Sequence, residues 1–263
     1  MDAPNVFDPE YYQRLYEIEE QHWWAKGMRS LMDGLFEKHL SGKQTMHVLD
    51  AGCGTGYLLN SLEERSDVAH VVGFDLSSEA LEFCRRRGHT RLALCSAIYP
   101  PFANESFDLI LCIDTLQHLS PAGADETAMR AFARMLRPGG FVYLRTNSAL
   151  GHRRLENVDA NLYRRYRRPE LKAMTQSAGL RVVKASYVNL LPSLWGMLRE
   201  YLNSNPQPTK AIGPGLTIQI PRSKRLNEIL FTHSRFEAWL IASLGLDMPF
   251  GHSLVVLAEK PME

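Results

Sequence analysis

Three glycines at alternate positions, Gly52, Gly54 and Gly56, directly follow an apolar segment and precede a helical pattern. Glycine lets a ligand approach the backbone where a Cβ would clash. Dinucleotide-binding loops have the spacing GxGxxG and hold a pyrophosphate, whereas here the spacing is GxGxG and Asp50 stands two residues before the first glycine. A carboxylate there would repel a pyrophosphate but accepts hydrogen bonds from an ammonium group. The motif therefore predicts a site for a cationic amino acid attached to a nucleoside.

A second acid, Asp75, follows some 19 residues after Gly56, at the end of the segment GFDLS. In dinucleotide-binding folds an acid at this spacing binds ribose hydroxyls. An acid at a strand end is weak evidence by itself, and glycines can simply make a tight turn. The combination at this spacing favours a nucleoside site over both of these readings.

The elements that would position these residues alternate between short apolar runs and helical patterns. Residues 9–40 predict two helices. From residue 46 onward five runs predict buried strands: MHVLDAG, HVVGFDLS, RLALCSA, FDLILCID and FVYLRT. Helical stretches separate them, and the Pro138-Gly139-Gly140 turn is expected to end the last of these helices. LRVVKASYV and HSLVVLAEK predict a sixth and a seventh strand. The alternation predicts an α/β fold with a mostly parallel sheet that is covered on both faces.

The pattern divides the chain into three expected parts. Residues 1–45 form an N-terminal helical lid, residues 46–187 plus 251–263 form the cofactor-binding core, and residues 188–250 form a helical insertion or cap. The cap combines an apolar helix, a Pro/Gly-rich link and a second amphipathic helix.

Composition narrows the class of partner. The 263 residues carry a net charge of +1, so no basic field draws the chain to nucleic acid, and none is expected as partner. The cysteines show neither CxxC spacing nor histidines in register, so no metal site is expected. The acidic, aromatic N-terminus is unlike a signal peptide, and no apolar run approaches the roughly 20 residues that span a bilayer. We expect a cytoplasmic protein with reduced thiols.

Four segments in order extend the likeness: VLDAGCGTG, GFDLS, CSAIYPPFANESFDLILCIDTLQHL and LRPGGFVYL. Together they resemble the class I S-adenosylmethionine-dependent methyltransferases of the large methyltransferase-11 type. The resemblance implies a Rossmann-like seven-stranded sheet of order 3-2-1-4-5-7-6, with N-terminal helices and, in this chain, a helical insertion before the last strand. The flanking segments HWW, RRYRRPEL and MPFGHS resemble a bacterial subgroup of that family.

The resemblance also implies a cofactor site for S-adenosyl-L-methionine, with S-adenosyl-L-homocysteine as product. Asp75 would hold the ribose hydroxyls, Leu76 would pack on the adenine, and the next loop would line the adenine edge. Many relatives have Asp at the place of Ser96, so here the acceptor is weaker, and cofactor affinity is modest or another group assists. The matching positions are Asp50, Gly52, Cys53, Gly54, Gly56, Asp75, Leu76, Ser96, Ala97, Ile98 and Asp114.

Further residues are candidates for the cofactor site and for catalysis. His118 follows the fourth strand and is either a general base or a structural contact. Trp24, with its neighbour Trp23, predicts an aromatic cover over the cofactor or, alternatively, helix packing. Arg29, or Lys26 on the same stretch, is a candidate for the methionine carboxylate.

An arginine-rich run at residues 153–168 contains the substrate candidates Tyr163, Arg165 and Tyr166. Arginine suits phosphate or carboxylate, which predicts an acidic acceptor. An RNA-facing patch and a solvated face with local salt bridges are the alternatives. The cap carries an aromatic stripe at helical spacing, formed by Trp195, Tyr201, Phe231, Phe236 and Trp239 together with Met197. This stripe predicts a core, a homodimer interface, a wall for an apolar acceptor or a membrane-surface contact.

The sequence therefore predicts methyl transfer to an oxygen, a nitrogen or, less directly, a carbon of a small molecule. A natural-product or glycan intermediate with an acidic or apolar portion would fit. The alternatives are methylation of RNA or protein, and cofactor binding without catalysis. The segment IDTLQHL stands at the place where an NPPY-type tetrapeptide would indicate adenine or glutamine amide targets. Its presence counts against such targets.

Overall fold

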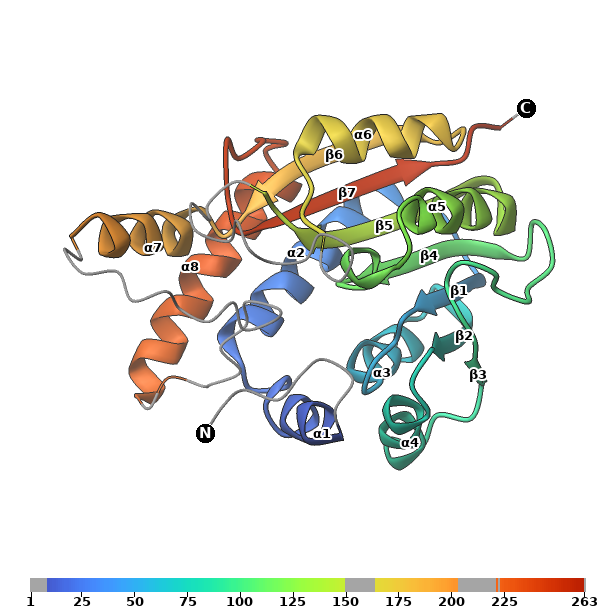
Figure 1. Cartoon of the computed structure of the whole chain (residues 1–263), viewed down its shortest axis with the longest axis horizontal. Helices are drawn as coiled ribbons and strands as arrows, with labels where there is room; N and C mark the ends of the chain where they lie inside the picture. Colours follow the sequence, from blue (N-terminus) through green and yellow to red (C-terminus); the bar gives the residue numbers. More distant parts are fainter. Residues whose placement is uncertain (1–8, 150–163, 203–220, 222, 263) are drawn as a thin grey trace.

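The described residues of the computed structural model, 9–149, 164–202, 221 and 223–262, fold around one seven-stranded sheet (Figure 1). The strand order is β3-β2-β1-β4-β5-β7-β6, which confirms the expected order. The strands are β1 (Met46–Ala51), β2 (Val68–Asp75), β3 (Leu92–Leu94), β4 (Phe107–Ile113), β5 (Leu136–Asn147), β6 (Arg181–Val188) and β7 (Ser253–Glu259).

Only β7 runs against its neighbours, pairing antiparallel with both β5 and β6. The pairs β1–β2, β1–β4, β2–β3 and β4–β5 are parallel, so the carboxyl ends of these strands lie along one edge of the sheet. Ligands of open α/β sheets bind outside this edge. The topology therefore brings the ends of β1, β2, β4 and β5 to one place.

Helices cover both faces of the sheet, with α5 and α6 over one face and α2, α3 and α8 over the other (Figure 1). Their bounds are α1 (Pro9–Ile18), α2 (Trp23–His39), α3 (Tyr57–Glu63), α4 (Ser78–Arg86), α5 (Ala124–Met135), α6 (Arg168–Ser177), α7 (Leu190–Leu202) and α8 (Lys224–Ala242), with a short 3-10 turn at Leu116–His118.

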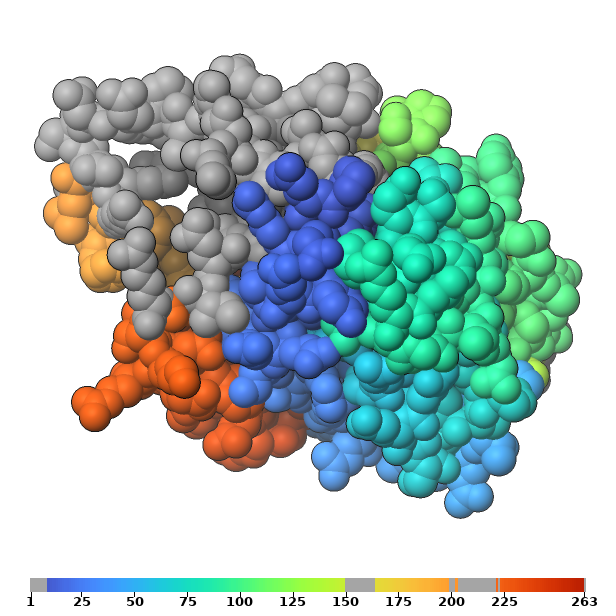
Figure 2. Space-filling view, turned by 90° about the horizontal axis from the view of Figure 1, so that it is seen from below, coloured from blue at the N-terminus to red at the C-terminus, as the bar shows by residue number. Residues whose placement is uncertain are grey.

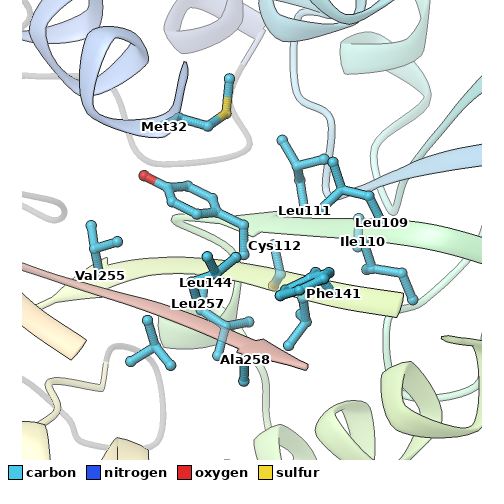
Figure 3. Close-up of a cluster of buried hydrophobic side chains, with 14 of the residues drawn as sticks. Met32, Leu109, Ile110, Leu111, Cys112, Phe141, Leu144, Val255, Leu257 and Ala258 are labelled. Atoms are coloured by element: carbon cyan, nitrogen blue, oxygen red, sulfur yellow. The ribbon is translucent and has the colours of Figure 1, made fainter. Parts of the chain in front are cut away.

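The apolar core fills both faces of the central strands. Figure 3 shows Met32 of α2, Leu111 of β4 and Val255 of β7 among the side chains that gather there. Phe36 of α2 packs edge-on against Tyr143 of β5, with ring centroids 5.5 Å apart. Strands buried on both faces explain why the sequence shows apolar runs rather than strict alternation.

Two boundaries differ from the sequence prediction. The third strand is limited to Leu92–Leu94, because the chain leaves the sheet before Ser96. Helix α5, which connects β4 to β5, ends at Met135, before the predicted Pro138-Gly139-Gly140 turn. Leu136 already pairs with Phe107, and the turn is an irregularity inside β5.

The predicted cap helices do not stand apart from the predicted lid. Helix α8 packs along α2, and Asn227 links the two by accepting from Trp23 N at 3.2 Å and donating to Gln21 O at 3.1 Å. Trp195, Phe236 and Trp239 are 68%, 56% and 47% exposed, so this part of the aromatic stripe is surface rather than core. The three-part division of the chain remains a prediction.

The crossing of α2 and α8 yields a test of this packing. A Cβ added to Gly27 would lie 1.9 Å from Ser234 Oγ, so Gly27→Ala should lower the free energy of unfolding by about 1–3 kcal/mol. Its gain in helix propensity, about 1 kcal/mol, should not offset the clash. Denaturant unfolding measures the change.

Gly34→Ala on the same helix is the matched control, because its added Cβ would meet Ala242 Cβ at 3.0 Å, a much milder contact. Adding Ser234→Gly to Gly27→Ala should recover stability. A Gly27→Ala variant as stable as the wild type would contradict this packing.

Candidate active site

A cavity of about 240 Å³ opens at the carboxyl edge of the sheet. Its floor comes from the ends of β1, β2, β4 and β5, and α1 with the start of α2 closes it from outside. A wider groove of about 800 Å³ lies on the surface between α1 and α4, but none of the predicted site residues lines it. The small cavity is therefore the place where the sequence motifs meet.

The glycine loop explains its own composition. Gly52, Gly54 and Gly56 all have positive φ, at +81°, +55° and +79°. A Cβ on Gly52 would lie 2.1 Å from Thr115 Oγ1, and one on Gly56 would lie 3.0 Å from Cys84 Sγ. A Cβ on Gly54 would meet nothing within 4 Å. Packing thus requires the outer glycines, while the middle one leaves the backbone open on the cavity side.

Asp75 at the end of β2 is held by the loop that it faces. Its carboxylate accepts hydrogen bonds from Gly54 N at 2.9 Å and from Ser77 N at 3.0 Å. Burial raises the pKa of Asp75, and these backbone donors oppose the rise. The carboxylate is fixed in orientation and has lone pairs left for hydroxyl donors.

Two more carboxylates are buried around the same cavity. Burial and the charge of Asp75 raise the pKa of Asp50 to about 7, and Arg145 offsets only part of this. Burial raises the pKa of Glu19 to about 7, against the effect of its hydrogen bonds from Thr55 and Arg87. Asp114 also lines the cavity. Four carboxylates therefore face a space in which Arg145 is the one lining arginine or lysine among the described residues, and this favours a cationic ligand.

Arg145 and Asp114 form an ion pair at the cavity wall. Asp114, at the end of β4, accepts from Arg145 Nη2 at 2.6 Å and from Nε at 3.3 Å. The guanidinium lies 4.4 Å from the ring centroid of Trp24, which also lines the cavity. The start of α2 is thereby fastened to the end of β5.

His118 lines the cavity at the end of the 3-10 turn that follows β4. Burial lowers its pKa, and the charge of Asp114 acts in the opposite direction. A lowered pKa keeps the imidazole neutral near pH 7, which is the form that accepts a proton.

The structure brings most of the predicted cofactor residues together around this cavity. Ser96 Oγ accepts from Ile98 N at 3.2 Å. The predicted residues that line the cavity are Trp24, Asp50, Gly52, Cys53, Gly54, Asp75, Leu76, Ser96, Ala97, Asp114 and His118. Gly56 and Ile98 do not line the cavity, although their neighbours in the chain, Thr55 and Ala97, do.

Arg29 is not brought into the cavity, which corrects its predicted placement. It faces Asp33 one helical turn later, at 3.7 Å. Lys26 instead lies over the ring of Phe231 at 4.6 Å. The rotation of α2 that buries its apolar side against the sheet turns both cations away, and Arg145 is the guanidinium at the cavity.

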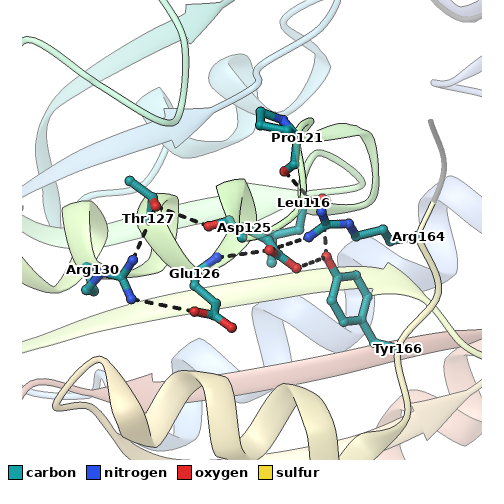
Figure 4. A network of polar contacts seen from close by, with 9 residues as sticks. Leu116, Pro121, Asp125, Glu126, Thr127, Arg130, Arg164 and Tyr166 are labelled. Carbon is teal, nitrogen blue, oxygen red and sulfur yellow. Dashed lines mark hydrogen bonds and ion pairs between the residues drawn. The ribbon is translucent and has the colours of Figure 1, made fainter. Parts of the chain in front are cut away.

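The hydroxyl of the substrate candidate Tyr166 is engaged in the fold, and its substrate role stays a prediction. It is buried and donates to Asp125 Oδ2 at 2.8 Å, while Arg164 pairs with the same carboxylate (Figure 4). Arg165 is half-buried. Burial lowers the pKa of His252, and the charge of Arg165 lowers it further. Tyr163 lies outside the described residues.

Sequence reasoning missed several lining residues. Tyr11, Tyr12, Leu15 and Glu19 come from α1 and the turn after it, and no motif marks them. Arg145 lies near the end of β5, where it pairs with Ile113 next to Asp114, so the sheet topology could have identified it. Among the described residues no helix could cross a bilayer and no group of three His, Cys, Asp or Glu side chains could hold a metal ion.

The raised pKa of Asp50 yields a stability prediction for the ligand-free protein. Because the folded-state pKa exceeds the ordinary value, the cost of ionising Asp50 is absent in acid and grows as the pH rises towards 7 and above. Asp50→Asn should therefore raise the free energy of unfolding by about 1–2 kcal/mol near pH 8, and by little near pH 4.

Denaturant unfolding at both pH values measures this difference. Asp67→Asn is the control, because Asp67 lies outside the cavity and pairs with Arg65 at 2.8 Å. This variant should show no gain in the free energy of unfolding. A destabilised Asp50→Asn protein at the higher pH would contradict the predicted electrostatic cost.

Comparison with known proteins agrees with this geometry. Residues 49–144 match a family described as a methyltransferase domain. A protein of Encephalitozoon cuniculi described as a methyltransferase is 30% identical over 60% of this chain and 73% of its own length. A ubiquinone biosynthesis O-methyltransferase of Idiomarina loihiensis is 29% identical over 53% of this chain and 60% of its own length.

Among solved structures, a methyltransferase in complex with the Haloferax volcanii activator Trm112 superposes with a TM-score of 0.61. The match covers 97% of this chain and 96% of that one at 18% identity, which shows the shared fold. Together with the sequence relatives, these matches show that the chain belongs to the class I S-adenosylmethionine-dependent methyltransferases.

Proposed function

We propose that this enzyme transfers a methyl group from S-adenosylmethionine to an oxygen or nitrogen of a small molecule, such as a natural-product or glycan intermediate. The observation that carries the proposal is the cavity that α1 and α2 close over the glycine loop and the strand ends. A cavity that α1 and α2 cover in part suits a small acceptor better than a macromolecular one. The ubiquinone O-methyltransferase relative acts in the biosynthesis of a small molecule.

The cavity residues suggest how the cofactor would lie. Its ribose hydroxyls would donate to Asp75, and its adenine would lie between Leu76 and the Ser96–Ala97 backbone. Its amino-acid end would then reach Asp50 and the open backbone at Gly54. Acidic side chains along the whole path fit a ligand that carries a sulfonium and an ammonium group.

S-adenosylmethionine supplies a methyl group that is already activated for transfer. The side chains therefore have to orient the acceptor and exclude water, and orientation alone contributes roughly 7–11 kcal/mol. Trp24 and Tyr11 form an aromatic wall on the outer side, and aromatic faces attract a cation. His118, kept neutral by burial, would take the proton of an oxygen or nitrogen nucleophile.

The Arg145–Asp114 pair stands where an acceptor would enter from the β4–β5 side. An acidic group on the acceptor would be drawn to this guanidinium. A contact surface outside the cavity is supported by three exposed aromatic side chains on α7 and α8, Trp195, Phe236 and Trp239. A second copy of the chain is one partner that could bind there.

The cofactor site is tested by Asp75→Ala. The variant loses the acceptor for the ribose hydroxyls and a fixed partner of Gly54 N, so affinity for S-adenosylmethionine should fall about 100-fold or more. Calorimetric titration measures the dissociation constant. Asp33→Ala on α2, outside the cavity, should bind like the wild type. Equal affinity of Asp75→Ala and wild type would refute the proposed placement.

The role of His118 is tested by His118→Ala with an acceptor identified by a gain of one methyl mass. Loss of a general base should lower kcat about 100-fold or more while leaving cofactor affinity unchanged. Because burial lowers the pKa of His118, wild-type activity should persist below pH 6.5 and fall only as the pH drops through the lowered pKa. A kcat within a few-fold of wild type would assign His118 a structural role.

A further inference from the structure

Glu19 is a buried carboxylate in an unusual position. It follows α1 directly, in the turn that leads to α2, and only 7% of its surface is exposed. It lines the cavity together with Asp50 and Gly54, although it belongs to none of the sequence motifs. Burial of a carboxylate is costly unless partners compensate it, so its contacts need an explanation.

One oxygen of Glu19 connects the N-terminal segment to the glycine loop and to α4. Oε1 accepts from Thr55 Oγ1 at 2.5 Å and from Arg87 Nη2 at 2.8 Å. Arg87 also donates from Nε to Thr55 O at 3.0 Å, and it pairs with the exposed Glu20. Its guanidinium lies 4.3 Å from the ring centroid of Tyr16. Arg87 thus holds both sides of the contact.

The other oxygen, Oε2, accepts no hydrogen bond from the described residues. Burial raises the pKa of Tyr11 to about 12, and the charges of Asp114 and Glu19 add to the rise. Tyr12, the next residue, is influenced by Asp75 instead. Tyr11, Glu19 and Asp114 all line the same cavity.

We propose that Glu19 binds the α-ammonium group of S-adenosylmethionine, so that the cofactor itself fastens the N-terminal segment over the site. This inference rests on the proposed placement of the cofactor, with its ribose at Asp75 and its amino-acid end beyond Gly54. An ammonium donates up to three hydrogen bonds and carries the charge that a buried carboxylate needs. Thr55 and Arg87 act as positioning residues, because their hydrogen bonds hold the carboxylate of Glu19 in place.

The packing of α1 fits this role. Tyr12 packs with Ala80 and Phe83 of α4 in a small apolar cluster separate from the main core. In Figure 2 the N-terminal segment lies on the outside of the molecule, against the region of α4. A segment held by one small cluster and one ion-pair network can open at low cost, whereas the main core cannot.

The test compares ligands with and without the amino-acid end. Glu19→Gln keeps the shape of the side chain but removes its charge, so affinity for S-adenosylmethionine should fall about tenfold or more. Affinity for 5′-methylthioadenosine, which has no amino-acid end, should stay at the wild-type value. Glu17→Gln, two residues earlier on the exposed side of α1, should bind both ligands like the wild type. Calorimetric titration measures all three proteins.

Limited trypsin digestion provides a second readout. S-adenosylmethionine should slow cleavage at Arg14 of α1 in the wild type and in Glu17→Gln, but much less in Glu19→Gln at equal saturation. Matching thermal melts of the ligand-free proteins would establish that Glu19→Gln folds.

Wild-type affinity of Glu19→Gln for S-adenosylmethionine would overturn the inference. An equal loss for both ligands would also overturn it, because Glu19 would then act only through the glycine loop. Failure of the wild type to bind S-adenosylmethionine, or unchanged binding by Asp75→Ala, would instead contradict the proposed cofactor placement.

Discussion

The gathering of four carboxylates around one small cavity, three of them buried, is the constraint on which the rest of this site depends. Parallel strands bring Asp50, Asp75 and Asp114 to the same edge of the sheet, and the N-terminal segment adds Glu19. Each acid needs compensation. Backbone N–H groups hold Asp75, Arg145 pairs with Asp114, and Thr55 with Arg87 supports Glu19. Asp50 is compensated only in part, by the charge of Arg145. A cationic ligand would supply what the fold leaves out.

The same constraint divides the work between rigid and detachable parts of the molecule. The glycine loop and the strand ends belong to the close-packed core, where a Cβ at Gly52 would collide with Thr115. Among the contacts of the described residues, the Tyr12 cluster and the Arg87 network attach helix α1 to the rest of the fold. If the cofactor completes the closure of α1 over the glycine loop, a polar network suits this junction better than further apolar packing, because the network can separate when the cofactor leaves.

The sequence was sufficient where a site residue belongs to a local pattern. The glycines and Asp75 lie in one strand-turn-helix-strand stretch, so their spacing carries their geometry, and the ordered motifs carry the strand order. Arg29 was placed at the cavity, and the Asp125 partner of Tyr166 was not foreseen, because helix rotation and buried side-chain pairs are tertiary properties. Glu19 could not be found from sequence, since its position depends on how α1 returns over the sheet.

The most direct test of this account is the number of protons released when S-adenosylmethionine binds. Calorimetry in buffers of different ionisation enthalpy measures it, and pH 6.5 is suitable because the cofactor's amino group is then already protonated. Carboxyls with pKa values near 7 should ionise against the bound cation, so we predict net proton release, smaller in Asp50→Asn. Binding without proton release, or with proton uptake, would contradict the claim that the cavity's acids are poised for a cationic ligand.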